Sequence, residues 1–298
     1  MALPRINESS WYELQIPSTK QDVTFRPFLV KEQKILLIAS ESQDKKQIIQ
    51  AMMDTITSCI REPIKIDELA SFDIDYLFTK IRSKSVGETS NIIVNCTQCN
   101  HGNEVSVNVS EASIVGDIKP STIKLTSDIS IEMRYPTYRK MMSNSSILSD
   151  DADQTKVMFE ILSTCIEAVV SSEERISLAD ESKEEIDTFI ESLTTEQFTK
   201  ITEFVQNMPK LTYSTQVTCT ECGHVNDLTL SGLEDFFLVN LSHESLENFY
   251  RVNFQLLQHH NYSLFEIENM VPWEREIYLI MLMDHLKEQE QQMQQQSG

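Results

Sequence analysis

The chain has 298 residues, of which 40% are hydrophobic, and a formal net charge of −21. This length and composition predict a folded, soluble globular protein of two domains, or of one domain with an insertion, and exclude a disordered chain. The sequence contains no apolar run of about 18 residues, no basic-then-apolar amino terminus and no basic stripe with aromatics, which excludes a membrane span, Sec export and nucleic-acid binding.

The amino-terminal residues predict a hairpin followed by a helix. Loose alternation of apolar and polar residues over 14–28 predicts the hairpin, and Pro27 ends it. Residues 30–39 then read as a helix. The side chains predicted to face inward on this helix are Ile35, Leu36 and Ile38.

Two more helices are predicted before the first cysteine motif. One covers residues 48–60, ends before Pro63 and carries Cys59 on its flank. The other covers residues 67–85. Its predicted apolar face contains Phe72, Tyr76, Leu77 and Ile81.

Two nearly identical stretches, 123 residues apart, each carry a Cys-x-x-Cys motif. Residues 95–103 read NCTQCNHGN, and residues 218–226 read TCTECGHVN. Each motif follows an apolar residue or run and precedes an alternating run, which predicts a strand, a tight turn and a second strand. Asn100 and Gly223 follow the second cysteine of each motif, and we expect a left-handed backbone there because asparagine and glycine tolerate it best.

The two turns predict one structural zinc site. Two residues between cysteines allow both sulfurs of a turn to point at one ion, and two turns complete a tetrahedral set of four thiolates. Such a closed site leaves no open coordination position, so we expect the metal to stabilise the fold. The predicted ligands are Cys96, Cys99, Cys219 and Cys222.

Two alternatives to this site stay open. The motifs could be redox or disulfide pairs, although a thioredoxin-like Cys-x-x-Cys normally opens a helix, whereas strand-like residues follow both motifs. A histidine could replace a cysteine, although His101 and His224 both lie just past complete pairs.

The segment between the motifs begins with strand-like residues. Residues 123–135 alternate and contain a turn at Ser127-Asp128. Residues 143–153 are polar and read as a loop. A helix is then predicted through Val157, Ile161, Ile166 and Val169.

Two further helices and a strand lead back to the second motif. The helices cover residues 186–193 and 198–205, and Thr194-Thr195 caps the second one. Residues 211–218 return as a strand. The chain therefore leaves the first cysteine pair, forms a mostly helical insertion at about 110–210, and returns to complete the site.

The carboxyl-terminal part, from Leu233, is predicted to be all helical. Ser263 is a predicted N-cap, with Glu266 three residues later. Pro272 starts another helix. The Gln-rich tail is a fraying helix or a disordered segment. One helical face is predicted to contain Leu246, Phe249, Phe254 and Leu257.

These elements predict an α+β fold that is mostly helical. Small β elements surround a split, zinc-ribbon-like site of four cysteines that holds a long insertion. We expect three regions: an α+β region over 1–95, the zinc module with its insertion over 96–232, and a helical region over 233–298.

The sequence contains none of the common catalytic motifs. It lacks the phosphate-binding, dinucleotide-binding, nucleophile-elbow and His-Glu-x-x-His patterns. Cys59 and Cys165 lie in apolar helical contexts and are predicted core thiols. The adjacent His259 and His260 face different ways on a helix, which argues against a joint metal site. We therefore expect no enzymatic activity.

Several segments resemble the T4-type bacteriophage baseplate protein family. They are the turn that begins at Cys96 and the runs over 25–39, 72–88, 133–138 and 270–278. The resemblance extends from about Val23 to about Leu286. It implies a baseplate hub subunit or hub assembly factor of a contractile-tailed phage, without enzymatic activity, whose partners are other baseplate or hub proteins.

The leading hypothesis is therefore a structural or assembly component of a phage baseplate. We expect it in the host cytoplasm during assembly and then in the virion. The alternative is a zinc-ribbon adaptor or regulator that binds a host protein. Residues 273–283 are the candidate contact surface, although Trp273 could equally be a buried helix start. The net charge indicates either solubility alone or a basic partner.

Overall fold

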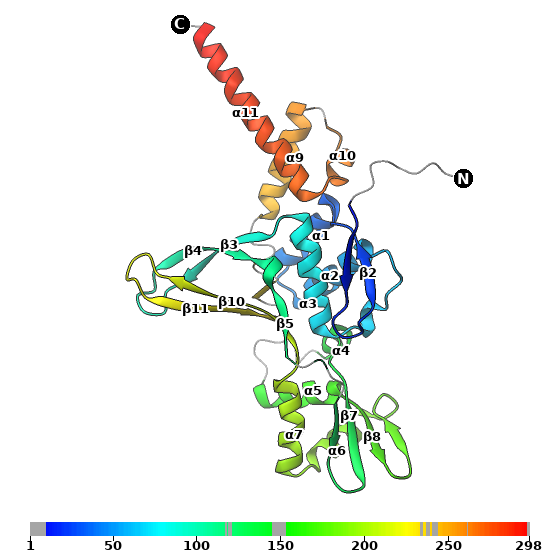
Figure 1. Ribbon diagram of the computed structural model, residues 1–298. Helices are drawn as coiled ribbons and strands as arrows, with labels where there is room; N and C mark the ends of the chain where they lie inside the picture. The colour runs from blue at the N-terminus through cyan, green and yellow to red at the C-terminus, as the bar shows by residue number, and fades with distance from the viewer. Residues whose placement is uncertain are drawn as a thin grey trace, which may run out of the picture.

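The computed structural model describes residues 10–116, 118, 121–144, 153–232, 235–236, 239, 244–260 and 262–296. These residues form an α+β fold in which a helical body carries three further parts (Figure 1). An arm of β-hairpins projects from one side of the body, a mixed lobe lies at one end, and a helical carboxyl-terminal unit lies at the other.

The body is formed by the predicted hairpin and three helices. The strands β1 (Tyr12–Gln15) and β2 (Asp22–Phe25) pair antiparallel, as the alternating residues predict. The helices are α1 (Val30–Glu41), α2 (Lys45–Cys59) and α3 (Ser71–Ser85). The core that they enclose includes Phe28, Leu36, Met52, Ile56, Cys59, Leu77, Phe78 and Ile81.

The inward face of α1 differs from the prediction. Leu36 is buried, but Ile35 and Ile38 are exposed. The helix lies between two hydrophobic clusters, because Leu36 packs into the body while Val30 and Leu37 pack against the carboxyl-terminal unit. The two exposed isoleucines occupy the remaining part of the helix circumference, so the prediction for them was wrong.

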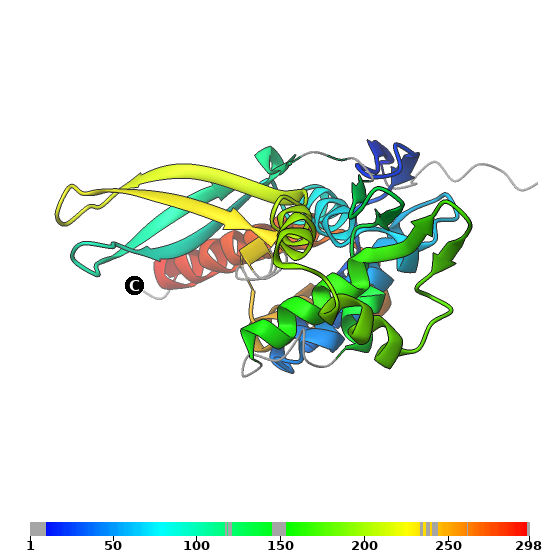
Figure 2. The same ribbon diagram turned by 90° about the horizontal axis from the view of Figure 1, so that it is seen from below.

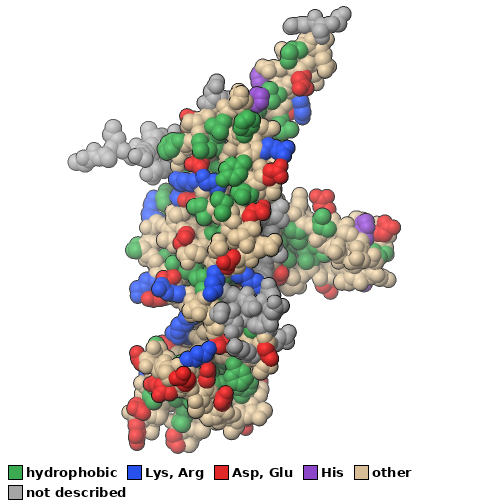
Figure 3. Space-filling view, turned by 180° about the vertical axis from the view of Figure 1, so that it is seen from behind, with side chains coloured by type: hydrophobic (Ala, Val, Ile, Leu, Met, Phe, Trp, Pro, Cys, Tyr) green, Lys and Arg blue, Asp and Glu red, His purple; other side chains and the backbone are tan. Residues whose placement is uncertain are grey.

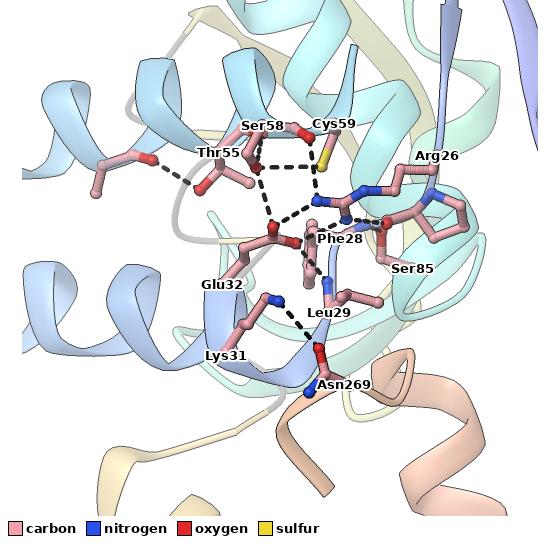
Figure 4. Close-up of polar contacts among 12 residues, drawn as sticks. Arg26, Phe28, Leu29, Lys31, Glu32, Thr55, Ser58, Cys59, Ser85 and Asn269 are labelled. Atoms are coloured by element: carbon pink, nitrogen blue, oxygen red, sulfur yellow. Dashed lines mark hydrogen bonds and ion pairs between the residues drawn. The ribbon is translucent and has the colours of Figure 1, made fainter. Parts of the chain in front are cut away.

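An ion pair between partly buried Arg26 and buried Glu32 fixes the start of α1 (Figure 4). Glu32 accepts hydrogen bonds from the Arg26 guanidinium at 2.6 and 3.0 Å, from the Leu29 amide at 2.6 Å and from the Ser58 hydroxyl at 3.0 Å. Burial alone would raise the pKa of Glu32, but these donors outweigh it and hold the pKa below its ordinary value. The Arg26–Glu32 pair therefore links the hairpin to α1 and α2.

The arm consists of two β-hairpins (Figure 2). The first pairs β3 (Thr89–Asn95) with β4 (Gly102–Asn108), and the second pairs β10 (Lys210–Thr218) with β11 (Val225–Ser231). The short strand β5 (Ser113–Val115) adds to the edge of β10 near the body. A hydrophobic cluster fills the base of the arm. It contains Val107, Val109, Ala112, Leu211, Leu230, Phe236 and Val239, with Tyr76 of α3 packed against it.

The insertion lobe contains a four-stranded sheet as well as helices. The sheet order is β6 (Ser121–Lys124), β7 (Ile129–Met133), β8 (Ile166–Ser171) and β9 (Arg175–Ser177), all antiparallel. The turn at Ser127-Asp128 between β6 and β7 confirms the predicted strand pair. The sequence analysis did not anticipate the other two strands.

The helix predicted through Val169 was wrong in its second half. The helix α5 (Gln154–Cys165) ends at Cys165, and β8 begins at the next residue. Isoleucine and valine are β-branched, and burial of alternate residues, Ile166 and Ala168, places one face of this run in the lobe core. The expected loop over 143–153 lies mostly outside the described residues.

The lobe helices match their predictions. They are α6 (Lys183–Glu191) and α7 (Thr195–Gln206). The Thr194 hydroxyl caps α7 by accepting a hydrogen bond from the Gln197 amide, and the Gln197 side-chain oxygen accepts one from the Thr194 amide.

The joint between lobe and body contains a buried acid. Tyr138, the first residue of α4 (Tyr138–Ser143), donates a 2.7 Å hydrogen bond to Asp75 of α3. Burial raises the pKa of Asp75 to about 7, although the Tyr138 hydroxyl acts in the opposite direction. Below about pH 7, the Asp75 side chain of the folded protein is therefore mainly protonated.

Asp75→Asn is expected to make the chain more stable than wild type at pH 8. The raised pKa means that the contribution of Asp75 to stability is fully present below about pH 4 and is lost as the pH rises through about 7. The loss is roughly 1.4 kcal/mol per pH unit in this window. Urea unfolding at pH 5 and pH 8 measures it. Exposed Asp54→Asn should follow wild type, and an unchanged pH dependence in Asp75→Asn would contradict the assignment.

The carboxyl-terminal unit packs on α1 through the helices α9 (Leu246–His260), α10 (Leu264–Glu268) and α11 (Pro272–Gln296). The predicted cap at Ser263 and the start at Pro272 are confirmed. Phe254 was wrongly placed on the buried face, because Phe249, Val252 and Leu256 form that face and Phe254 is 64% exposed.

The Gln-rich tail continues α11 as helix. None of the helices within the described ranges combines the length and apolar character needed to cross a bilayer.

Candidate metal centre

Both Cys-x-x-Cys motifs form the tight turns at the tips of the arm hairpins. In the first turn the Cys96 amide donates to the His101 carbonyl at 2.9 Å, and the Asn100 amide donates to the Cys96 carbonyl at 2.9 Å. The second turn repeats both bonds, at 2.8 and 3.0 Å, between the equivalent residues. Asn100 and Gly223 have φ of 59° and 73°, so the predicted left-handed positions are confirmed.

The four cysteine sulfurs converge between the two turns. All four lie within 4.8 Å of one another. The Cys96 and Cys222 sulfurs are 3.7 Å apart, and the Cys99 and Cys219 sulfurs are 3.6 Å apart. A tetrahedral zinc with Zn–S bonds of about 2.3 Å requires sulfur separations of about 3.8 Å. The structure therefore brings together all four residues that the sequence analysis selected.

A pair of buried asparagines cross-links the two hairpins, and the sequence analysis did not assign them a role. Asn226 on β11 accepts hydrogen bonds from the amide and hydroxyl of Thr97 in the opposite turn, at 2.9 and 2.8 Å. Asn103 on β4 accepts the same two bonds from Thr220, at 2.9 and 3.1 Å. The site thus has approximate internal two-fold symmetry. The signal was present, because Asn103 and Asn226 end the two matched nine-residue stretches.

The first sulfur of each turn is held in a setting that favours the thiolate. The Cys99 amide has the largest effect on Cys96 and lowers its pKa. Burial acts in the opposite direction, and the Gln98 amide lowers the pKa further, so that it reaches about 6. The Cys222 amide has the same effect on Cys219 and lowers its pKa. Backbone amides thus favour the thiolate form of one cysteine in each turn.

The second sulfurs behave in the opposite way. The His101 amide favours the thiolate of Cys99, but burial and the neighbouring sulfurs outweigh it and raise the pKa to about 12. The His224 amide and the Cys99 sulfur favour the thiolate of Cys222, but burial and the sulfurs of Cys219 and Cys96 outweigh them and raise its pKa. A bound cation would stabilise all four thiolates together, because metal coordination deprotonates thiols. The donor set, spacing and electrostatics therefore fit a tetrahedral zinc.

The other candidate ligands do not take part. Among the described residues, the ligand atoms that converge are the four sulfurs alone. The side chains of His101 and His224 are exposed in the turns, and these residues contribute through their backbone amides and carbonyls. Cys59 and Cys165 are buried thiols in the body and the lobe, as predicted.

Asn103→Ala and Asn226→Ala are expected to loosen opposite turns. Each change removes the two hydrogen bonds to the threonine of the opposite turn, which together contribute about 1–3 kcal/mol, and also the bonds that the asparagine NH2 group donates to backbone carbonyls of its own hairpin. Hydrogen exchange at the Thr97 amide should rise in Asn226→Ala, and exchange at the Thr220 amide should rise in Asn103→Ala, each by roughly tenfold or more. Each variant controls for the other. Equal changes at both amides in either variant would contradict the crossed pairing.

Two family profiles together cover almost the whole chain. The family described as T4 bacteriophage base plate protein matches residues 10–238. The family described as Baseplate hub assembly protein Gp51 C-terminal domain matches residues 241–287. The first match includes the body, the arm and the lobe, and the second includes α9, α10 and most of α11.

One curated relative supports the first match. The chain is 20% identical over 226 residues to the Baseplate hub assembly protein gp26 of Enterobacteria phage T4. The aligned region covers 76% of this chain and 97% of that protein. No solved structure matches the chain.

Proposed function

Since the chain belongs to the T4 bacteriophage base plate protein family, we propose that it is a non-enzymatic component in the assembly of the baseplate hub of a contractile-tailed phage. Both the gp26 relative and the carboxyl-terminal profile carry the description of hub assembly proteins. The candidate centre supports a structural role, because four sulfurs leave no coordination position for a substrate. Its partners are other baseplate proteins.

We also propose that zinc closes the arm. The hairpins are 123 residues apart in sequence, and the residues between them form the lobe. The base of the arm is held by hydrophobic packing, whereas its tip has the asparagine pair and the sulfurs. Closing so long a loop costs several kcal/mol of chain entropy, which a structural zinc can offset. We propose the same three regions, 1–95, 96–232 and 233–298, with β3 at the end of the first region pairing into the arm.

The function is tested by deleting the gene in the phage. Infected cells should then accumulate baseplate intermediates without a complete hub, and supplying the protein in trans should restore infectious particles. Normal baseplates in the absence of the protein would refute the proposed role. Mass spectrometry of purified particles then distinguishes the two forms of the proposal. A virion component remains in the particles, and an assembly factor is absent from them.

A further inference from the structure

The helix α11 presents an apolar stripe that nothing in the described chain covers. Trp273, Ile277, Ile280 and Met281 are 47%, 47%, 53% and 61% exposed. Their spacing of four, three and one residues places them on one side of the helix. The opposite side, with Arg275 and Leu282, is buried against α9 and α1.

The carboxyl-terminal unit carries further exposed hydrophobic side chains, including Phe254, Leu264 and Phe265. Figure 3 shows hydrophobic side chains gathered over the upper part of the molecule, where α9, α10 and α11 lie, while acidic side chains are frequent on the lobe. Isolated exposed apolar residues are ordinary, but a contiguous exposed stripe at helix-packing spacing marks an interaction surface.

The helix α11 extends past the hydrophobic cluster of the unit. Leu286 is the last residue of this helix that packs against that cluster. The helix continues from Lys287 to Gln296, and Figure 1 shows these turns projecting away from the rest of the chain.

The charges beside the stripe identify the kind of partner. Glu274 and Glu276 lie at one end of the helix, and Glu288 and Glu290 lie towards the other, whereas Lys287 is the one exposed lysine or arginine of α11. A second copy of this helix, parallel or antiparallel, would therefore place acids opposite acids. Like charges at helix pairs are unfavourable, so the surface disfavours self-association and favours a basic partner.

We infer that the exposed face of α11 binds an amphipathic helix of another protein, one whose apolar stripe is flanked by lysines and arginines. The apolar residues supply the buried area, and the acidic flanks select the partner and its orientation. This inference rests on the proposed function only for the source of the partner, which is another baseplate protein.

Photo-cross-linking in infected cells tests the inference. The full chain carries benzophenone-alanine in place of Ile277 and is supplied to a phage that lacks the gene. After irradiation, mass spectrometry should identify a cross-link to a Lys/Arg-rich helical segment of a baseplate protein. A second substitution, Ile280→Asp, should reduce the cross-link roughly tenfold or more, because it places a charge in the buried stripe.

A matched control separates this surface from a general effect. Ile93 lies on the arm and is more exposed than Ile280, so Ile93→Asp in place of Ile280→Asp should leave the cross-link unchanged. A cross-link to a second copy of the chain, or no cross-link at 277, would overturn the inference. Particle formation in the same cells is scored separately. Normal particles without the protein refute the proposed function, whereas particles that need the protein but give no cross-link refute only this surface.

Discussion

Cys219→Ser is expected to release one zinc ion per chain and to open the tip of the arm. Three sulfurs hold zinc far more weakly than four, and structural zinc contributes about 10–16 kcal/mol in small zinc-binding peptides. The loss should be local, because the body and the lobe have their own hydrophobic cores. Metal analysis of purified protein gives the zinc content. Hydrogen exchange should rise in β3, β4, β10 and β11 and remain unchanged in α2 and α3.

Cys165→Ser is the matched control for this prediction. Cys165 is a buried thiol in the core of the lobe, far from the four sulfurs in sequence and outside their cluster. Its replacement should lower the stability of the lobe and leave the zinc content unchanged. Equal zinc loss in both variants, or purified wild-type protein without zinc, would disprove the proposed ligand set.

The cysteine cluster could be predicted from the sequence because the residues that specify each turn are neighbours in the chain and occur in two matched copies. Two residues between cysteines, followed by Asn100 or Gly223, specify the turn almost independently of the rest of the chain. The matched copies then imply one shared site. Asn103 and Asn226 occur in the same copies, but their role depends on the opposite turn, and a single hairpin does not reveal it.

The errors arose where tertiary contacts decide the local structure. The residues from Ile166 to Val170 fit a helical spacing when read alone, but pairing with β7 and β9 makes them a strand. The buried face of α1 depends on two separate clusters, so a single inward face could not be read from the sequence. Short apolar runs are ambiguous for this reason.

Arg275 shows the same limitation at the candidate contact surface. The sequence analysis included it in the candidate contact surface over 273–283, but only 2% of Arg275 is exposed. It donates hydrogen bonds to both carboxylate oxygens of Glu244, at 2.8 and 2.7 Å, and to Asn253 at 3.1 Å. Gln33 of α1 donates a 2.8 Å bond to the same carboxylate. Arg275 therefore joins α11 to α9 and Glu244 within the carboxyl-terminal unit, and Glu244 in turn bonds to α1 of the body through Gln33.

Arg275→Ala is expected to destabilise the chain by about 3–5 kcal/mol, because it leaves the buried Glu244 carboxylate without its counter-charge. Burial raises the pKa of Glu244 even when Arg275 is present. Without the guanidinium the pKa should rise further, so protonation relieves part of the penalty. The deficit should then be smaller at pH 5 than at pH 8. Urea unfolding at both pH values, with hydrogen exchange in α9 and α11, measures the effect.

Two further variants make this prediction specific to the buried pair. Arg251→Ala removes an exposed ion pair with Glu247 from the neighbouring helix, and pairs of this kind contribute about 0–1 kcal/mol. Arg275→Met combined with Glu244→Leu replaces both charges by apolar side chains and should recover most of the lost stability, as the removal of both partners of a buried pair leaves no unpaired charge. A double variant as unstable as Arg275→Ala would show that packing of Arg275 on the Phe249 ring, 4.7 Å away, stabilises the unit more than the ion pair does.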